Sequence, residues 1–154
     1  MFYFDSSALV KYYISEAGSD WVRKLIDGQA VDVAISQLTL VEIAAAVEKR
    51  RRMKTIDERL RIRTLARFGM DCQARYTVVR VSDAIVELSV ALTARHPLRA
   101  YDAVQLASAL QIHEILNANH LAAVNFVSSD EALCQAAQAE GLAMVNPSTM
   151  DAGI

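Results

Sequence analysis

The sequence predicts a single α/β domain built around a mostly parallel central sheet. Three observations lead to this fold class. The 154 residues fit one domain. The composition, 53% hydrophobic and 22% charged, is that of a globular protein. Short strand-like segments alternate along the chain with long segments of helical periodicity, which is typical of parallel strands joined by helices.

Five short segments rich in β-branched or aromatic residues are predicted to form the strands. Residues of these types suit the pleated, half-buried surface of a sheet. The last of the five carries the weakest pattern. The predicted strands are Phe2–Phe4, Val31–Ile35, Thr77–Val81, Ala123–Val127 and Leu142–Val145.

Between the strands, apolar residues recur at the spacing of amphipathic helices. Gly28 and Gly141 stand where two helices should end before a strand, a common place for glycine. Pro97 separates two helical segments, and residues from about 49 to 75 are predicted to form a helical excursion from the α/β core. The predicted apolar stripes are Val22, Leu25 and Ile26; Leu40, Ile43, Ala44 and Val47; Ile85, Leu88, Val90 and Leu92; and Val104, Ala107, Leu110 and Leu116.

Four acidic residues follow the predicted strands in positions that suit a site. In an open parallel sheet, ligands bind beyond the carboxyl ends of the strands. Asp5 directly follows the first strand, and Asp130 follows the fourth. Glu42 lies in the first turns of the helix after the second strand, and Asp102 opens a later helix. All four are therefore expected to converge on one edge of the sheet.

Each of these acidic residues also has a purely structural interpretation. Asp and Ser are favoured at helix N-termini, so Asp5 and Asp102 could each simply begin a helix. The segments Thr39–Glu42 and Ser128–Glu131 both have the spacing of a capping box. For Asp130, a cap and a site residue are equally good interpretations.

The surroundings of Glu42 and Asp102 favour function for the set as a whole. Both residues are flanked by apolar neighbours, so their segments are expected to be largely buried. Unpaired carboxylates in such surroundings are costly and raise each other's pKa values, and no Lys or Arg is an obvious partner for all of them. A hard divalent cation would neutralise the set, and oxygen-only ligation suits Mg²⁺ or Mn²⁺. Such an ion can orient a phosphodiester and activate the attacking water.

The same residues resemble the signature of the PIN-domain family. The order and spacing of four segments fit a single-domain member, and the match extends over nearly the whole chain. It is closest to the VapC-type toxins of bacterial and archaeal toxin–antitoxin pairs. The segments are Asp5-Ser6-Ser7-Ala8-Leu9, Leu38-x-x-x-Glu42, the most specific block Tyr101-Asp102-Ala103-Val104-Gln105-Leu106-Ala107, and Ser128-x-Asp130.

This resemblance implies a three-layer α/β/α fold across residues 1–154 and a Mg²⁺- or Mn²⁺-dependent endoribonuclease. Ser6 would be a supporting polar residue near the metal, and Ser128 would occupy a position that is often threonine. The implied partners are an RNA substrate, a cognate antitoxin and a second copy of the chain in a homodimer. The catalytic and metal-binding carboxylates would be Asp5, Glu42 and Asp102, with Asp130 as the fourth and most variable one.

The stretch from Glu48 to Arg75 is basic within an otherwise acidic protein. Ten Lys or Arg residues against four acidic ones give a local charge of +6, whereas the whole chain carries −2. Such a patch suits phosphate or partner binding, and the alternative is a solvated helical face with internal ion pairs. Binding is favoured before residue 55 and the solvated face after it. The predicted contact residues are Lys49, Arg50, Arg51, Arg52 and Lys54.

Other classes of site find no support in the sequence. The three histidines lack metal-ligand spacing, and there is no Ser-His-Asp or Cys-His arrangement and no glycine-rich phosphate loop. Cys72 and Cys134 lack a C-x-x-C spacing and are expected to be reduced thiols. With no signal peptide and no apolar run approaching about 20 residues, a cytoplasmic protein without a membrane segment is expected.

The leading functional interpretation is an endoribonuclease toxin held inactive by its antitoxin. A second is a PIN nuclease that processes RNA without a toxin role. A third is a catalytically weak module that binds RNA or protein, against which the intact set of Asp5, Glu42 and Asp102 argues. A co-transcribed neighbouring gene for a small DNA-binding protein would separate the first from the second.

Overall fold

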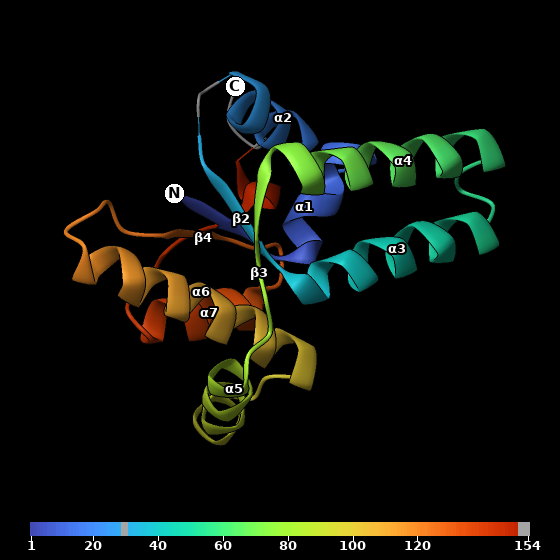
Figure 1. Ribbon diagram of the computed structural model, residues 1–154. Coiled ribbons are helices and arrows are strands. Elements are labelled where there is room, and N and C mark those ends of the chain that lie inside the picture. Colours follow the sequence, from blue (N-terminus) through green and yellow to red (C-terminus); the bar gives the residue numbers. More distant parts are fainter. Residues whose placement is uncertain (29–30, 151–154) are drawn as a thin grey trace.

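A five-stranded parallel sheet forms the centre of the computed structural model, which describes residues 1–28 and 31–150 (Figure 1). The strand order is β3-β2-β1-β4-β5, and every neighbouring pair is parallel. The chain therefore builds the sheet outwards in one direction from β1 and then returns to add β4 on its other side. The strands are β1 Phe2–Phe4, β2 Val33–Ser36, β3 Tyr76–Val79, β4 Asn125–Val127 and β5 Ala143–Val145.

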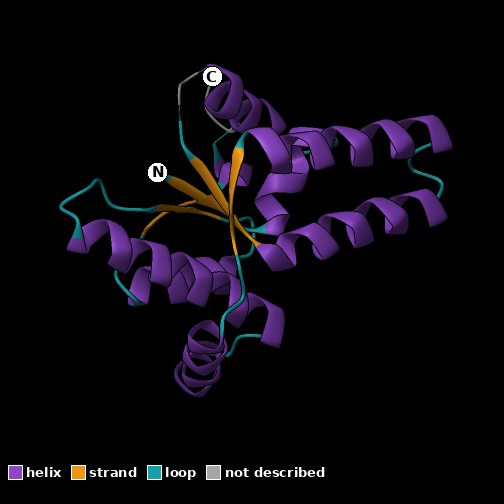
Figure 2. Cartoon of the chain, viewed as in Figure 1, coloured by secondary structure: helices purple, strands orange, loops and turns teal. Residues whose placement is uncertain are grey.

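Helices cover both faces of the sheet, which gives the predicted three-layer α/β/α fold (Figure 2). Helices α1 to α4 pack on one face and α5 to α7 on the other. No helix in the described part of the chain is both long and apolar enough to cross a membrane. The helices are α1 Ser6–Tyr13, α2 Ser19–Gly28, α3 Gln37–Arg52, α4 Glu58–Ala74, α5 Asp83–Arg95, α6 Ala100–Ala118 and α7 Glu131–Ala139, followed by the short 3₁₀ helix η1 Pro147–Thr149.

Alternation along the short strands supplies both cores. In β1, the fully buried side chains of Tyr3 and Phe4 belong to opposite faces of the sheet. In β4, Phe126 and Val127 divide in the same way. Because successive side chains of a strand point to opposite faces, a strand of three apolar residues contributes to both layers at once.

The order of the strands decides where a site can form. The direction in which strands are added reverses between β1 and β4. Such a reversal, called the switch point of the sheet, opens a crevice beyond the carboxyl ends of the two strands. Asp5 follows β1 directly, and Ser128 follows β4 directly. The next strand, β2, ends at Ser36 and leads straight into α3. Three neighbouring strands therefore deliver polar residues to one edge of the sheet.

The fold class and all five strands are confirmed, with strand ends shifted by up to two residues. Gly141 has φ of +91° just beyond α7, a conformation that favours glycine. Pro97 lies between α5 and α6 as predicted. The prediction that Leu40 and Val90 belong to the core is wrong, since they are 38% and 66% exposed. The buried residues of α3 are instead Thr39, Ile43 and Val47. Polar Thr39 is therefore buried where the apolar pattern favoured Leu40.

Helices α3 and α4 form an antiparallel pair that projects from the body of the protein (Figure 1). Ile56 closes its tip in the turn between the helices and is buried. Arg61 on α4 makes ion pairs with Glu48 on α3 and with Glu58 on its own helix. The first of these pairs joins the outer ends of the two helices. The tip lies about 15 Å beyond Glu42, given ten residues of helix from Glu42 to Arg52 at ~1.5 Å each.

Candidate functional site

Asp5 is a buried carboxylate held by the start of its own helix. Its side chain is the N-cap of α1, with Oδ1 accepting from the backbone N of Ala8 at 3.0 Å. The Ser7 hydroxyl lies 2.9 and 3.0 Å from its two oxygens. Burial nevertheless raises the pKa of Asp5 from 3.8 to about 7, against the opposing effect of these hydrogen bonds and of Ser128. The cap and site interpretations of Asp5 are therefore compatible.

Glu42 and Asp102 come from different helices and influence each other. The Glu42 carboxylate accepts a hydrogen bond from Gln105 Nε2 at 2.5 Å. Burial raises the pKa of Glu42, hydrogen bonds from Gln105 and Ser6 lower it, and the charge of Asp102 raises it further. Burial likewise raises the pKa of Asp102, followed by the charge of Asp130, and Arg99 opposes both.

Neither Glu42 nor Asp102 caps a helix. The N-cap of α3 is Ser36, so the predicted capping box Thr39–Glu42 is wrong. Helix α6 has Arg99 at its N-cap position and no side-chain cap, which leaves Asp102 in the first turn. The prediction that both segments are largely buried is also wrong, since Val41 and Tyr101 are 66% and 62% exposed. Each acidic residue lies at the boundary between the core and solvent.

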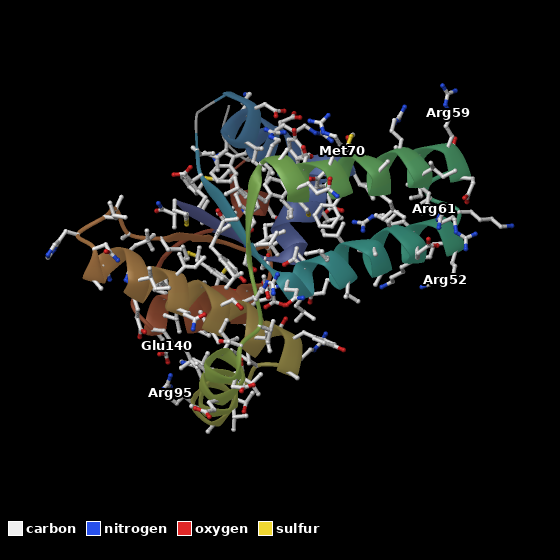
Figure 3. The ribbon with its side chains drawn as sticks, viewed as in Figure 1. Arg52, Arg59, Arg61, Met70, Arg95 and Glu140 are labelled. Atoms are coloured by element: carbon white, nitrogen blue, oxygen red, sulfur yellow. The ribbon has the colours of Figure 1, made fainter. Side chains whose placement is uncertain are left out.

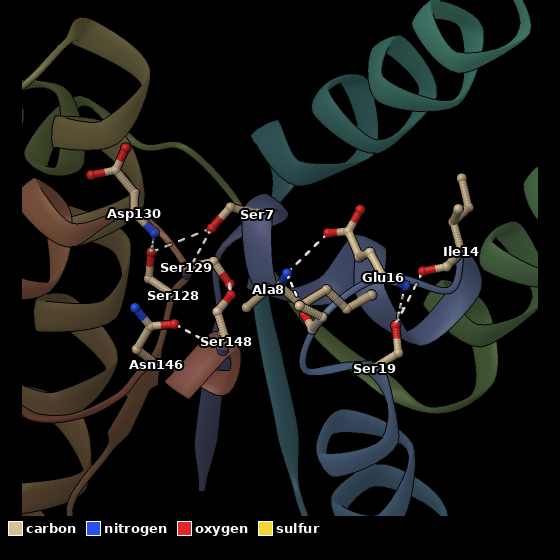
Figure 4. A network of polar contacts seen from close by, with 12 residues as sticks. Ser7, Ala8, Ile14, Glu16, Ser19, Ser128, Ser129, Asp130, Asn146 and Ser148 are labelled. Atoms are coloured by element: carbon tan, nitrogen blue, oxygen red, sulfur yellow. Dashed lines mark hydrogen bonds and ion pairs between the residues drawn. The ribbon is translucent and has the colours of Figure 1, made fainter. Parts of the chain in front are cut away.

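Asp130 is linked to Ser7 through a network of serines (Figure 4), and Ser7 in turn donates to Asp5. Its Oδ1 caps α7 by accepting from Leu133 N at 2.9 Å, so Ser128–Glu131 is not the capping box that its spacing suggested. The fully buried Ser128 accepts from Asp130 N at 3.0 Å and lies 3.4 Å from the Ser7 hydroxyl. Ser7 also accepts from Ser129 N at 2.9 Å. These contacts join the first turn of α1 to the loop after β4.

The four carboxyl groups offer the oxygen donors that a hard cation requires. Within the described residues, no Lys or Arg makes an ion pair with Asp5, Glu42, Asp102 or Asp130. The donors are all oxygen, which suits Mg²⁺ or Mn²⁺. In residues 1–28 and 31–150, however, no three acidic, histidine or cysteine side chains stand close enough to hold one ion. The donor set nevertheless fits a divalent cation by its chemistry, and waters would complete the coordination.

The sequence matches the profile of the PIN domain over residues 2–139. The chain belongs to the PIN domain family. No curated protein gives a significant sequence match.

Solved structures with the same fold are distant in sequence. A toxin–antitoxin complex from Klebsiella pneumoniae shares 18% identity, with a TM-score of 0.60 and coverage of 96% of this chain and 98% of that chain. FitAcB from Neisseria gonorrhoeae shares 16%, with a TM-score of 0.64 and coverage of 96% and 98%. The sarcin–ricin loop cleaving toxin VapC20 from Mycobacterium tuberculosis shares 16%, with a TM-score of 0.63 and coverage of 92% and 96%. At such identities the likeness establishes the PIN fold.

The basic residues of this PIN domain divide into paired and unpaired sets. Arg50 pairs with Glu16, and Arg51 pairs with Glu48. Beyond residue 58, the predicted pair of Glu58 with Arg61 is present. Arg67 and Arg75 pair with the buried Asp71, whereas Arg59 and Arg63 make no ion pair within the described residues. Arg52 and Arg59 extend outwards at the tip of the α3–α4 pair (Figure 3). Of the predicted contact residues, those without an ion pair in the described chain are Lys49, Arg52 and Lys54.

The PIN site contains two further polar residues, Ser7 and Gln105, for which the sequence pattern predicts no role. Ser7 bonds to Asp5 on one side and to the loop after β4 on the other. Gln105 is 1% exposed and bonds to Glu42. Gln105 stands three residues after Asp102, on the same helical face, and a lone amide among apolar residues is the signal that could have identified it. Ser6, predicted as a supporting residue near the metal, forms a hydrogen bond that lowers the pKa of Glu42.

Proposed function

We propose that this PIN domain is a metal-dependent endoribonuclease and the toxin of a toxin–antitoxin pair. The observation that carries this is the set of four carboxyl groups at the switch point of the sheet, without an ion-paired Lys or Arg among the described residues. Asp5, Glu42 and Asp102 would be the principal ligands of Mg²⁺ or Mn²⁺, with Asp130 as a fourth, outer ligand. The bound ion would polarise the scissile phosphodiester and lower the pKa of the attacking water.

The residues of the chain prepare this site before any substrate arrives. Ser7 and the Ala8 backbone N–H fix the Asp5 carboxylate, and Gln105 fixes that of Glu42. Burial raises the pKa of Asp5 to about 7, so this carboxyl readily holds a proton near neutral pH when no cation is present. Binding a cation would displace that proton, because ligation requires the ionised form.

The unpaired cations at the tip of the α3–α4 pair are proposed to contact RNA. Lys49, Arg52 and Lys54 would meet phosphates on nucleotides away from the scissile bond, with Arg50 and Arg51 as weaker contributors because Glu16 and Glu48 already bind them. Such contacts add affinity without reading sequence.

We propose that a separate protein inhibits the site by supplying a cation, since no Lys or Arg of the described chain makes an ion pair with its carboxylates. A guanidinium pairs well with two carboxylates. An antitoxin segment bearing arginine would therefore block Asp5, Glu42 or Asp102 most directly, with further contacts along α3. The structural neighbour from Klebsiella pneumoniae is a toxin–antitoxin complex. We propose the same partner here, together with a homodimer and a cytoplasmic site of action.

Induced expression of the wild-type chain in a bacterial host tests the toxin role. Growth should stop within one or two generations and should continue when Asp102→Asn is expressed at the same level. Co-expression of the product of a neighbouring antitoxin-like gene should restore growth to the wild type. Normal growth with abundant, soluble wild-type protein that still cleaves RNA in vitro would favour RNA processing instead.

Divalent cations should stabilise the folded protein. Only the native state gathers the carboxylates, so Mn²⁺ or Mg²⁺ at 100 times its Kd should raise the free energy of unfolding by about 2.7 kcal/mol. Differential scanning fluorimetry with increasing Mn²⁺ measures this as a rise in Tm. Ca²⁺ should also raise the Tm while supporting little cleavage, because it is larger and less strict in geometry. RNA cleavage that continues undiminished after exhaustive chelation would contradict the metal requirement.

Two substitutions of Lys54 can distinguish an effect on stability from an effect on RNA binding at the tip. Lys54 has φ of 59°, a left-handed conformation that is unfavourable for lysine and easy for glycine. We expect Lys54→Gly to raise the free energy of unfolding by roughly 0.5 to 1 kcal/mol and to weaken RNA binding in low salt. Lys54→Ala should lose the same binding without the gain in stability. Urea unfolding and RNA titrations in the Asp102→Asn background measure both, and unchanged binding in both variants would exclude Lys54 from the RNA contact.

A further inference from the structure

The Gln105 side chain is a buried amide with all of its hydrogen-bonding groups engaged. It lies on α6, three residues after Asp102, and is 1% exposed. Its Nε2 donates to Glu42 Oε2 at 2.5 Å and to Thr39 Oγ1 at 2.9 Å, both on α3. Its Oε1 accepts from the Tyr3 hydroxyl at 2.8 Å. A primary amide offers two N–H donors and one carbonyl oxygen, so each of its polar groups has a partner.

The chemistry of these partners permits one orientation of the amide. An ionised Glu42 carboxylate can only accept, so the NH₂ group must face α3. The carbonyl oxygen then faces Tyr3, which must donate. A phenol hydroxyl can donate one hydrogen bond, and the Tyr3 hydroxyl lies 2.8 Å from Gln105 Oε1. A flipped amide would place its carbonyl oxygen against the Glu42 carboxylate, which is repulsive.

The anchor of this arrangement is the sheet itself. Tyr3 is fully buried in β1, two residues before Asp5, and its ring stacks on Phe126 of β4 at 5.6 Å and 10°. The hydroxyl that orients Gln105 is therefore fixed by the two strands that flank the switch point. Glu42, in contrast, stands on a turn of α3 beside the exposed Leu40 and Val41. Its carboxylate gains its position from side-chain contacts and not from burial in the core.

We propose that Gln105 is a positioning residue, oriented by Tyr3, that places the Glu42 carboxylate relative to Asp102 and Asp5 for binding a divalent cation. The proposal rests on the proposed function. Helix α6 then carries both Asp102 and the amide that holds Glu42, so one rigid element sets the relation between two carboxylates from different helices. Without the amide, the three side-chain torsions of Glu42 would leave its carboxylate spread over several positions.

The test is calorimetric titration of Mn²⁺ into purified, metal-free protein, together with the kinetics of RNA cleavage. Gln105→Met keeps the length of the side chain and removes its hydrogen bonds. We expect Mn²⁺ affinity about tenfold weaker, and a kcat lower by at least tenfold with KM changed by less than threefold. Tyr3→Phe keeps the ring stack and leaves the amide free to turn, so it should weaken Mn²⁺ binding by about threefold.

A matched control separates positioning from general loss of stability. Asp71 on α4 is 3% exposed and is bound by Tyr13, Arg67 and Arg75, on the face of the sheet opposite α6. Asp71→Asn should lower the Tm at least as much as Gln105→Met and leave Mn²⁺ affinity unchanged. A parallel fall of Mn²⁺ affinity and Tm in this control would assign the effect of Gln105→Met to stability and overturn the proposal.

A double-mutant cycle decides whether Gln105 acts through Glu42. In the Glu42→Gln background, Gln105→Met should weaken Mn²⁺ binding no further, since the group that it holds has been removed. Full additivity, or wild-type Mn²⁺ affinity and kcat in both Gln105→Met and Tyr3→Phe, would overturn the proposal while cleavage by the wild type upheld the nuclease. Failure of the wild type to bind Mn²⁺ or cleave RNA would instead overturn the proposed function.

Discussion

Asp5→Asn and Asp102→Asn should each lower RNA cleavage by at least 1,000-fold while the protein stays folded. Both substitutions keep the shape of the side chain and remove a charge proposed to bind the cation. Asp102 caps no helix, so its loss leaves α6 intact. Asn is as good an N-cap as Asp, so Asp5→Asn keeps the contact to Ala8 N. A loss of about 4 kcal/mol of transition-state stabilisation corresponds to the expected fall in rate.

The measurement is single-turnover cleavage of a labelled RNA at saturating protein, with circular dichroism and Tm to confirm folding. Asp130→Asn is the matched control, since its carboxyl also caps a helix, α7, and is proposed to be an outer ligand. It should lower the rate by about tenfold or less. Cleavage at the wild-type rate by both Asp5→Asn and Asp102→Asn would show that the carboxylates have another role.

The sequence predicts the layers and the sheet because both depend on patterns that survive packing. Strand–helix alternation and runs such as Phe2–Phe4 specify which segments cross the core. The sequence predicts less reliably which face of each helix is buried. Leu40 and Thr39 are neighbours on α3, and apolar character favours Leu40 as the core residue. The structure buries Thr39 because Gln105 lies opposite and supplies its hydrogen bond.

The residues of the site could be predicted from the sequence, but the hydrogen bonds that join them could not. Asp5 and Ser128 could be placed at strand ends because parallel strands finish at one edge of a sheet. That Ser7 joins them depends on the winding that sets β4 beside β1, which the sequence pattern does not specify. The local pattern also placed the cap of α3 at Thr39, where the chain uses Ser36, directly at the end of β2. Spacing alone identifies capping residues but does not choose among several that overlap.

Asp5→Asn should also make the metal-free protein more stable at neutral pH, a second large effect of the same substitution. Burial raises the pKa of Asp5 from 3.8 to about 7. Between these pH values the native state binds more protons than the unfolded state, so the free energy of unfolding falls as pH rises through this window. At about 1.4 kcal/mol per pKa unit, the penalty approaches ~4 kcal/mol above pH 7, and we expect a gain of roughly 2 kcal/mol after the change in contacts to Ser7.

Urea unfolding from pH 4 to pH 8 in excess chelator measures the difference between the variant and the wild type, which cancels the similar trends of Glu42 and Asp102. The gain should be small near pH 4 and complete above pH 7. Saturating Mn²⁺ should reverse the order, because the cation stabilises the ionised carboxylate of the wild type and gains little from asparagine. Equal stability of the two proteins at pH 7.5 without metal would mean that Asp5 is ionised at little cost in the native state. The conflict between folding and function at this residue would then be absent.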